Sequence, residues 1–496
     1  MRPAYYQNKL EALRERTGKK ELRHLARQVA LSFLDRYFYN DQHEEEYVRL
    51  LCEMATCFDD DELNRIGASA LFGIVIEGLC DDFEELQTET YNRVMCHVVS
   101  ICRNMPMGAE LDRQLKDFGL NSYDDLFFRI EKLRNNSDQY KKGMEPPQKI
   151  LLLSRVTIGA DVAINSVMIQ RLTNMFPDAE IIVIGNSKLE KIYGGNPDIR
   201  IEIVDYSRHG GMFERFSVCH AVLEVINREF ASNKQENMIL VDPDSRLSQL
   251  GVLPLIKDEN YLFFNSRGKD SYPKKVSISE LANHWLDMVF GESEFCYPRV
   301  WLHNKALDLA TRFTEELRAA GCHNIIAINL GVGGNSRKRL SEDFEKKLLL
   351  KLLEEPKTVI ILDKGFGEEE VERTNRLLGV FNKGVYPAID TSFEAMVGNR
   401  LSRGIVSIES DIGQIAALIS KCDEFIGYDS ACQHIAASLG IPTYTIFAGS
   451  NNTRFIRRWH ACGPTKSEII HVDTLTHPPM FDTEDIVSRI IDARAV

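Results

Sequence analysis

The sequence lacks the features that mark secreted, membrane-spanning and zinc-binding proteins. Its first twenty residues contain no apolar core of a signal peptide, and its most apolar stretch, residues 68–80, is interrupted by Glu77 and too short to cross a bilayer. The eleven cysteines include no Cys-x-x-Cys pair, which favours reduced thiols over a disulfide framework or a zinc site. We therefore expect an intracellular, cytoplasmic protein without a bound metal, and peripheral attachment at the inner membrane is an open alternative.

An excess of positive charge is also missing. The 60 lysines and arginines are outnumbered by 73 acidic residues, and the net charge of -13 opposes long-range attraction to nucleic acid. With 44% hydrophobic and 27% charged residues, the composition is that of a folded globular protein. The length of 496 residues suggests about three domains, and we expect no nucleic-acid partner.

Apolar residues in the first part of the chain recur at intervals of three and four, as they do on amphipathic helices. The pattern is seen at Leu22, Leu25, Val29 and Phe33. It predicts an all-helical domain over residues 1–134. The following residues, 135–147, are polar, rich in turn formers and without periodicity, so they are predicted to form a linker.

After the linker, short apolar runs alternate with helical stretches, which is typical of a parallel sheet with crossover helices. The predicted strands are 149–153, 180–184, 201–204, 238–241 and 261–264 in a first block, and 325–329, 358–362, 425–427 and 443–447 in a second. We therefore predict two Rossmann-like α/β domains, over residues 148–305 and 306–496.

In open parallel sheets, ligands bind beyond the carboxyl ends of the strands. The most informative segment of this kind is the turn Gly427-Tyr428-Asp429-Ser430, where Ser430 is placed to cap a helix. The free amides of such a helix start, together with its dipole, bind phosphate oxygens. The alternative is an ordinary capped helix in which His434 is a structural histidine.

A second segment combines glycines with cations. Gly331, Gly333 and Gly334 precede Lys338 and Arg339. Glycines let backbone amides approach a pyrophosphate, and lysine or arginine neutralises the charge that develops on a leaving diphosphate. The order differs from a P-loop because no Gly-Lys-Ser/Thr follows. A plain surface turn is the alternative.

A third segment, residues 447–454, follows the last predicted strand and is small and polar, with Gly449 and Asn452 among its residues. It can supply amides to the same ligand, although a solvated turn has the same composition. In the first block, Asp161 lies where a loop enters a helix and faces the other block. A carboxylate there can take a proton from an acceptor hydroxyl, or it can simply cap its helix.

From residue 149 to 496 the sequence resembles the heptosyltransferases of glycosyltransferase family nine. The resemblance is carried by Gly427-Tyr428-Asp429-Ser430, His434 and Ala436-Ala437-Ser438-Leu439-Gly440-Ile441-Pro442, by Phe447-Ala448-Gly449-Ser450 and by the glycine-rich segment. It implies a GT-B fold, with two facing Rossmann-like domains after the all-α domain. It also implies inverting, metal-independent transfer of a sugar from a nucleotide sugar, typically ADP-heptose.

The resemblance also implies roles for single residues. Asp429 would bind hydroxyls of the donor sugar or ribose, the amides of Ser430 and Ala431 would bind phosphate, and Lys338 would bind the diphosphate. The first block departs from the family pattern, because Gly159-Ala160-Asp161 replaces a Gly-Asp pair and no proline stands near Ser166. From the position of Asp161 and the implied role of Lys338, we expect these two residues to be catalytic, with no cofactor.

The donor-binding residues predicted from these patterns are Gly331, Gly333, Arg339, Asp429, Ser430, Ala431, His434, Gly449 and Asn452. The acceptor is a hydroxyl of a glycan, a lipid-linked glycan or a protein. A non-catalytic nucleotide-sugar sensor or scaffold is the main alternative, and a nucleotide-sugar epimerase is a third. Three roles are alternatives for the helical domain: it binds a protein partner, it forms a homo-oligomer, or it only enlarges the fold.

Overall fold

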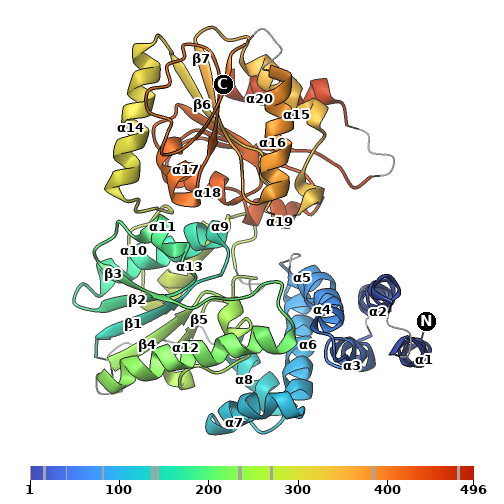
Figure 1. Ribbon diagram of the computed structural model, residues 1–496. Coiled ribbons are helices and arrows are strands. Elements are labelled where there is room, and N and C mark those ends of the chain that lie inside the picture. The colour runs from blue at the N-terminus through green and yellow to red at the C-terminus, as the bar shows by residue number, and fades with distance from the viewer. Residues whose placement is uncertain are drawn as a thin grey trace.

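The computed structural model shows a helical region beside two stacked α/β halves (Figure 1). It describes residues 2–14, 18–40, 42–80, 83–135, 140, 145–232, 237–267, 272–333, 335–381, 386–476 and 481–495. Most of the predicted linker, 135–147, therefore lies outside the described residues, as does Gly334 of the glycine-rich segment.

The first part of the chain is helical, as predicted. Its elements are α1 (Pro3–Arg14), α2 (Lys19–Asn40), α3 (Glu45–Met54), α4 (Asp61–Ala70), η1 (Leu71–Ile76), α5 (Glu77–Cys80), α6 (Glu85–Arg103), η2 (Pro106–Gly108), α7 (Ala109–Asp117) and α8 (Tyr123–Asn135). Leu22, Leu25, Val29 and Phe33 are buried along one side of α2, which explains their spacing. The Asp60 carboxylate accepts a hydrogen bond from the Glu62 amide and so caps α4.

The apolar stretch around residues 68–80 belongs to a longer helix than its composition suggested. α4, η1 and α5 run without a break over Asp61–Cys80, and these 20 residues are long and apolar enough to cross a membrane. The expectation that the stretch is too short was therefore wrong. In the structure, 61% of its most apolar window is buried, because the helix packs against neighbours such as α2 and α3.

The first α/β half contains a five-stranded parallel sheet in the order β3-β2-β1-β4-β5. Its strands are β1 (Lys149–Leu153), β2 (Glu180–Gly185), β3 (Ile199–Ile203), β4 (Met238–Asp242) and β5 (Tyr261–Phe263). The accompanying elements are α9 (Ile158–Ala160), η3 (Asp161–Asn165), α10 (Ser166–Met175), α11 (Leu189–Tyr193), α12 (Met212–Ser232), η5 (Arg246–Ser248), η6 (Asp258–Asn260) and α13 (Ile278–Phe290). Helices cover both faces, so a central strand such as β1 is buried along its whole length and is apolar after its first residue, Lys149.

The second half contains a seven-stranded parallel sheet in the order β12-β11-β10-β6-β7-β9-β8. Its strands are β6 (Asn324–Asn329), β7 (Thr358–Asp363), β8 (Ala388–Ser392), β9 (Gly404–Glu409), β10 (Glu424–Tyr428), β11 (Thr443–Phe447) and β12 (Ser467–His471). Its helices are α14 (Asn304–Ala319), η7 (Ser336–Lys338), α15 (Glu342–Leu352), α16 (Glu368–Phe381), α17 (Ile412–Ile419), α18 (Ala431–Ser438), α19 (Thr453–Arg458) and α20 (Thr483–Ala495). Strands β8, β9 and β12 were not predicted.

The two halves face each other, with α9 and α11 of the first opposite α17, α18 and α19 of the second (Figure 1). They touch closely: a Cβ added to Gly159 would lie 3.2 Å from the Cα atom of Ala431. The Lys191 ammonium lies 3.0 Å from the Asp411 carboxylate across this boundary. Two parallel sheets in facing halves, preceded by helices, confirm the predicted GT-B fold class.

The helical region shares an apolar core with the first half and reaches both halves through polar and aromatic contacts. Arg129 Nε donates to Asp258 Oδ1 over 2.8 Å, which ties α8 to the first half. On the other side, the Arg454 guanidinium at the start of α19 pairs with Glu84. These contacts place α19 at the junction of the helical region and the two halves.

Candidate functional site

The turn after β10 brings a helix amino terminus to the boundary between the halves. Ser430 is the residue that precedes α18, as predicted, but its hydroxyl makes no capping bond and lies 3.4 Å from Asn329 Oδ1 instead. Among the described residues, the backbone amides of Ser430 and Ala431 have no hydrogen-bond acceptor. Free amides at a helix start favour binding of an anion such as phosphate.

Lys338 reaches this turn from the loop after β6. Its ammonium lies 2.5 Å from Asp429 Oδ2 and 3.3 Å from the Asp429 carbonyl oxygen. Gln433 Nε2 donates to the other carboxylate oxygen of Asp429 over 2.6 Å. The structure therefore brings together Lys338, Asp429, Ser430 and Ala431, which were predicted to share one site.

The glycine-rich loop is held by a residue that the sequence analysis did not name. Glu370, at the start of α16, accepts a hydrogen bond from the Val332 amide over 2.8 Å. A Cβ on Gly331 would lie 2.8 Å from Glu370 Oε2, so a side chain at that position would displace the carboxylate that holds the loop. Gly333 has a positive φ of 60° and no neighbour within 4 Å of an added Cβ, so its backbone is open.

Arg339 points away from the turn that holds Lys338. Its guanidinium pairs with Glu369 at 2.8 Å and with Glu370 at 3.4 Å. In this position it neutralises the carboxylate that anchors the loop. Its direct contact with a donor stays a prediction.

The loop after β11 packs against the glycine-rich loop. Gly449 has a φ of 78°, its amide donates to Thr474 Oγ1 over 3.0 Å, and an added Cβ would lie 2.7 Å from the Arg337 carbonyl oxygen. The Asn452 side-chain oxygen accepts from the amides of Arg454 and Phe455 and caps α19. Gly449 and Asn452 thus join loops and helices here, and their donor contacts stay predictions.

His434 lies inside the boundary between the halves. It is 4% exposed, its ring centroid is 6.0 Å from that of Trp459, and burial lowers its pKa to about 4. The imidazole is therefore neutral near pH 7 and is suited to packing rather than to charge neutralisation. A Cβ on Gly159 would lie 3.3 Å from the His434 ring, so this histidine also limits how the halves approach.

Asp161 is fully buried under the loop that follows β1. Its carboxylate accepts hydrogen bonds from the Ser154 hydroxyl, at 2.9 and 3.0 Å, and from the Arg155 amide at 2.7 Å. The residue that precedes α9 is Thr157, so the Asp161 side chain closes the preceding loop and does not cap its helix. Burial is the largest influence on this carboxyl and raises its pKa to about 7.

Sequence reasoning missed two further groups at the carboxyl ends of strands. Asp363, the last residue of β7, accepts from Asn329 Nδ2 at 2.5 Å and from Ser410 Oγ at 2.9 Å, which joins the ends of β6, β7 and β9. In the first half, Arg155 lies 3.4 Å from the buried Asp244 carboxylate, which also pairs with Arg267. Both groups follow strands that were predicted, so inspection of every strand end would have found them.

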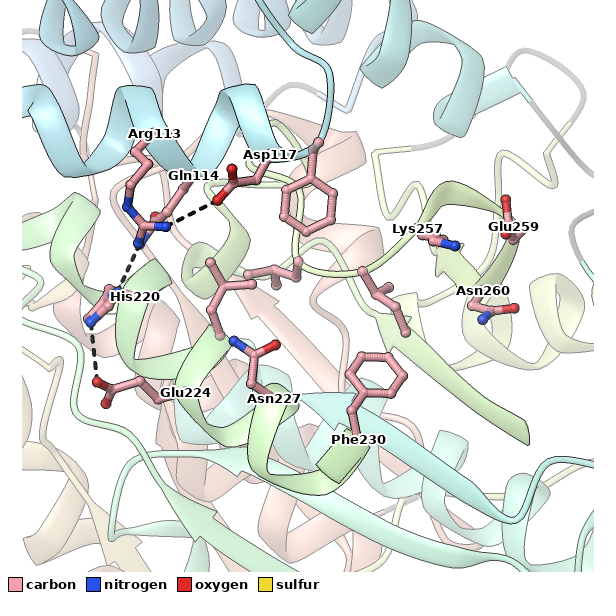
Figure 2. A pocket seen from close by; sticks show the side chains of 14 residues that line it. Arg113, Gln114, Asp117, His220, Glu224, Asn227, Phe230, Lys257, Glu259 and Asn260 are labelled. Atoms are coloured by element: carbon pink, nitrogen blue, oxygen red, sulfur yellow. Dashed lines mark hydrogen bonds and ion pairs between the residues drawn. The ribbon is translucent and has the colours of Figure 1, made fainter. Parts of the chain in front are cut away.

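A large cavity of about 960 Å³ lies elsewhere, between α7, α12 and the segment before β5 (Figure 2). Its rim is polar: Gln114 contacts the His220 ring at 2.9 Å, and Arg113 donates to Asp117 at 3.1 Å. Phe230, near the end of α12, also lines it. Because this region lies near the amino ends of β4 and β5, it is distinct from the free helix start and the loops described above.

Comparison with known proteins agrees with this arrangement. The family model of glycosyltransferase family 9 (heptosyltransferase) matches residues 405–489, which extend from β9 into α20. No curated protein sequence matches the chain. A solved glycosyltransferase family 9 protein from Veillonella parvula is 16% identical, covers 71% of this chain and 98% of its own, and has a TM-score of 0.50.

Two Escherichia coli structures are also similar over much of the chain. ADP-heptose lps heptosyltransferase II is 15% identical, with 70% of this chain and 98% of its own covered and a TM-score of 0.45. Heptosyltransferase WaaC with ADP is 13% identical, with 70% and 99% covered and a TM-score of 0.43.

The family match falls on the part of the second sheet that holds the Asp429 turn, and the Veillonella parvula structure shares the fold of both halves. The resemblance predicted from the sequence is therefore confirmed where it can be compared: residues 405–489 match the family model of glycosyltransferase family 9 (heptosyltransferase), and both α/β halves have the fold of a solved family 9 protein.

Proposed function

We propose that this protein transfers a sugar, with inversion at the anomeric carbon, from an ADP-heptose-like nucleotide sugar to an acceptor hydroxyl of a glycan, a lipid-linked glycan or a protein. The observation that carries the proposal is the convergence of Lys338 with the free amides of Ser430 and Ala431. The proposed reaction uses no metal, and the helical region is proposed to bind a partner protein.

Departure of the nucleoside diphosphate places negative charge beside α18. Lys338 and the helix amino terminus stabilise that charge, and the Asp429 carboxylate, which now holds Lys338, binds hydroxyls of the donor. Interactions that strengthen as the charge develops lower the barrier of the chemical step. This division of roles assigns donor binding to the second half and acceptor binding to the first.

Asp161 is the proposed base that takes the proton of the acceptor hydroxyl as the oxygen attacks the anomeric carbon. A pKa near 7 suits this task, because a base of that pKa is both partly ionised and able to accept a proton at neutral pH. Its two oxygens are satisfied by Ser154 and Arg155, so the role requires the loop of residues 154–161 to open when the acceptor binds.

Replacing Lys338 with alanine tests the donor site. Loss of a charge-assisted contact of about 1.5–3 kcal/mol predicts roughly 10- to 150-fold weaker binding of ADP, measured by calorimetry. The loss should be much smaller for adenosine, which has no diphosphate. Lys351→Ala removes a surface lysine of the same half, 48% exposed, and is the matched control. Equal binding of ADP by wild type and Lys338→Ala would contradict the assignment.

One observation favours the alternative of a nucleotide-sugar sensor: the Asp161 side chain is 0% exposed. A sensor would bind nucleotide sugars without turning them over. Mass spectrometry of an ADP-heptose incubation distinguishes the two functions, because even slow release of ADP and free sugar requires a working catalytic site. Tight binding with no release, on any acceptor, would favour the sensor.

A further inference from the structure

Phe366 is an aromatic side chain left exposed at the edge of the proposed donor site. It lies in the loop between β7 and α16 and is 79% exposed, although apolar rings of this size are usually buried. Its only described ring contact comes from the first half, where the Lys188 ammonium lies 4.2 Å from the ring centroid. An aromatic face at the boundary between two halves is available to stack on a planar group.

The backbone around Phe366 is held firmly, so its position does not depend on its own packing. The Phe366 amide donates to Glu370 Oε2 over 2.8 Å, and the other oxygen of the same carboxylate holds the Val332 amide of the glycine-rich loop. Gly365 and Gly367 have φ values of 78° and 90°, which only glycine adopts readily. The Glu370 carboxylate therefore fixes the position of the exposed ring relative to the glycine-rich loop.

The order of the strands indicates in which direction a bound nucleotide extends. With the proposed diphosphate position between the ends of β10 and β6, a nucleoside that follows the sheet edge extends toward β11 on one side or toward β7 on the other. The β11 side is filled, because the Gly449 loop is packed against Arg337 and its amide is bonded to Thr474. The β7 side, one strand spacing of about 4.8 Å from β6, presents the open ring of Phe366.

We propose that Phe366 is the stacking platform for the base of the nucleotide sugar. The base would take the ring face that Lys188 now covers, and this exposed lysine is free to move aside. The inference rests on the proposed function, since it deepens the same donor site. Under this proposal the loop after β7 binds the base, whereas Lys338 and the start of α18 bind the diphosphate.

The test is calorimetric titration of wild type and variants with ADP, UDP, GDP and CDP, and with inorganic pyrophosphate. Stacking of a base on an aromatic ring predicts that Phe366→Ala binds the preferred nucleoside diphosphate about 5- to 150-fold more weakly. Affinity for pyrophosphate should stay within twofold. Phe366→Trp should keep nucleotide affinity, whereas Phe366→Leu, apolar but without a ring face, should lose it as alanine does.

Phe128→Ala is the matched control, because Phe128 is 73% exposed on α8 of the helical region. It should bind every ligand as wild type does. Unchanged nucleotide affinity in Phe366→Ala, in a wild-type background that binds nucleotide, would overturn this inference and leave the proposed function standing. Equal losses for nucleotide and pyrophosphate would also overturn it, since they indicate a displaced loop. Failure of wild type to bind any nucleotide diphosphate would overturn both.

Discussion

Replacing Asp161 with asparagine separates the cost of burying this carboxyl from its proposed role as a base. Asparagine has nearly the same shape, its carbonyl oxygen can keep the bond from the Arg155 amide, and its Nδ2 can donate to Ser154 Oγ. The fold of the loop should therefore survive the substitution. What disappears is the titration of the group.

The magnitude follows from the difference between the pKa of Asp161 in the folded and unfolded states. Burial raises its pKa to about 7 from an ordinary value of 3.8. Between these values the folded state binds more protons than the unfolded state, so the free energy of unfolding falls as the pH rises. The fall is about 1.4 kcal/mol per pH unit, or on the order of 3 kcal/mol between about pH 5 and about pH 7.

The free energy of unfolding of Asp161→Asn should not show this fall with pH, because asparagine does not titrate. Relative to wild type, its free energy of unfolding should rise by on the order of 3 kcal/mol between about pH 5 and about pH 7 and stay constant above that range. Urea unfolding at several pH values, followed by tryptophan fluorescence, measures the difference. Because Asp242 and Asp363 also have pKa values raised to about 6 by burial, the comparison must be between variant and wild type at each pH.

Parallel stability curves for the two proteins would refute the reasoning from burial. Activity gives a second and independent result. If Asp161 is the base, kcat/KM of wild type should rise with pH through about 7, and Asp161→Asn should lose at least a hundredfold in turnover. A variant that gains stability at neutral pH and keeps its turnover within a few-fold would assign Asp161 a structural role only.

Two further predictions concern the loops around the diphosphate. Gly449→Ala should lower the melting temperature by several degrees and weaken ADP binding at least tenfold, because the new Cβ meets the Arg337 carbonyl at 2.7 Å; Gly379→Ala, in open space on α16, is the control. Glu370→Gln should increase hydrogen exchange in residues 331–333 and 365–367, since a buried carboxylate that accepts two backbone bonds is lost. Glu369→Gln, 79% exposed and paired with the same arginine, should leave that exchange unchanged.

Most of the predicted strands that the structure confirms are buried, mainly apolar runs in the interior of a sheet, and β3 and β5 at the edges of the first sheet are the exceptions. β1 and β7, for example, are buried along their whole length. The missed strands β8 and β12 are the two edges of the second sheet, where residues are only partly buried and the apolar signal is weak. β9 is buried and apolar, but the polar residues before it hid its start. β3, an edge strand of the first sheet, begins at Ile199, two residues earlier than predicted.

The convergence of Lys338 with the Asp429 turn was predictable for a simple reason. Both follow buried strands, β6 and β10, and parallel strands end at the same edge of a sheet. The direction in which each side chain turns was not predictable in the same way. Arg339, next to Lys338 in sequence, turns to the carboxylates of α16, and no periodicity could have indicated that.

The sequence by itself determined the fold class, because long apolar runs separated by amphipathic helices can be buried only as parallel sheets covered on both faces. It also determined the turn proposed to bind the diphosphate, since a strand, a short turn and a helix start follow one another locally. Only the tertiary structure decided that Asp161 is buried, that Glu370 joins two loops and that Phe366 stays exposed. Each of these depends on contacts between residues far apart in the chain, and such contacts leave no local pattern in the sequence.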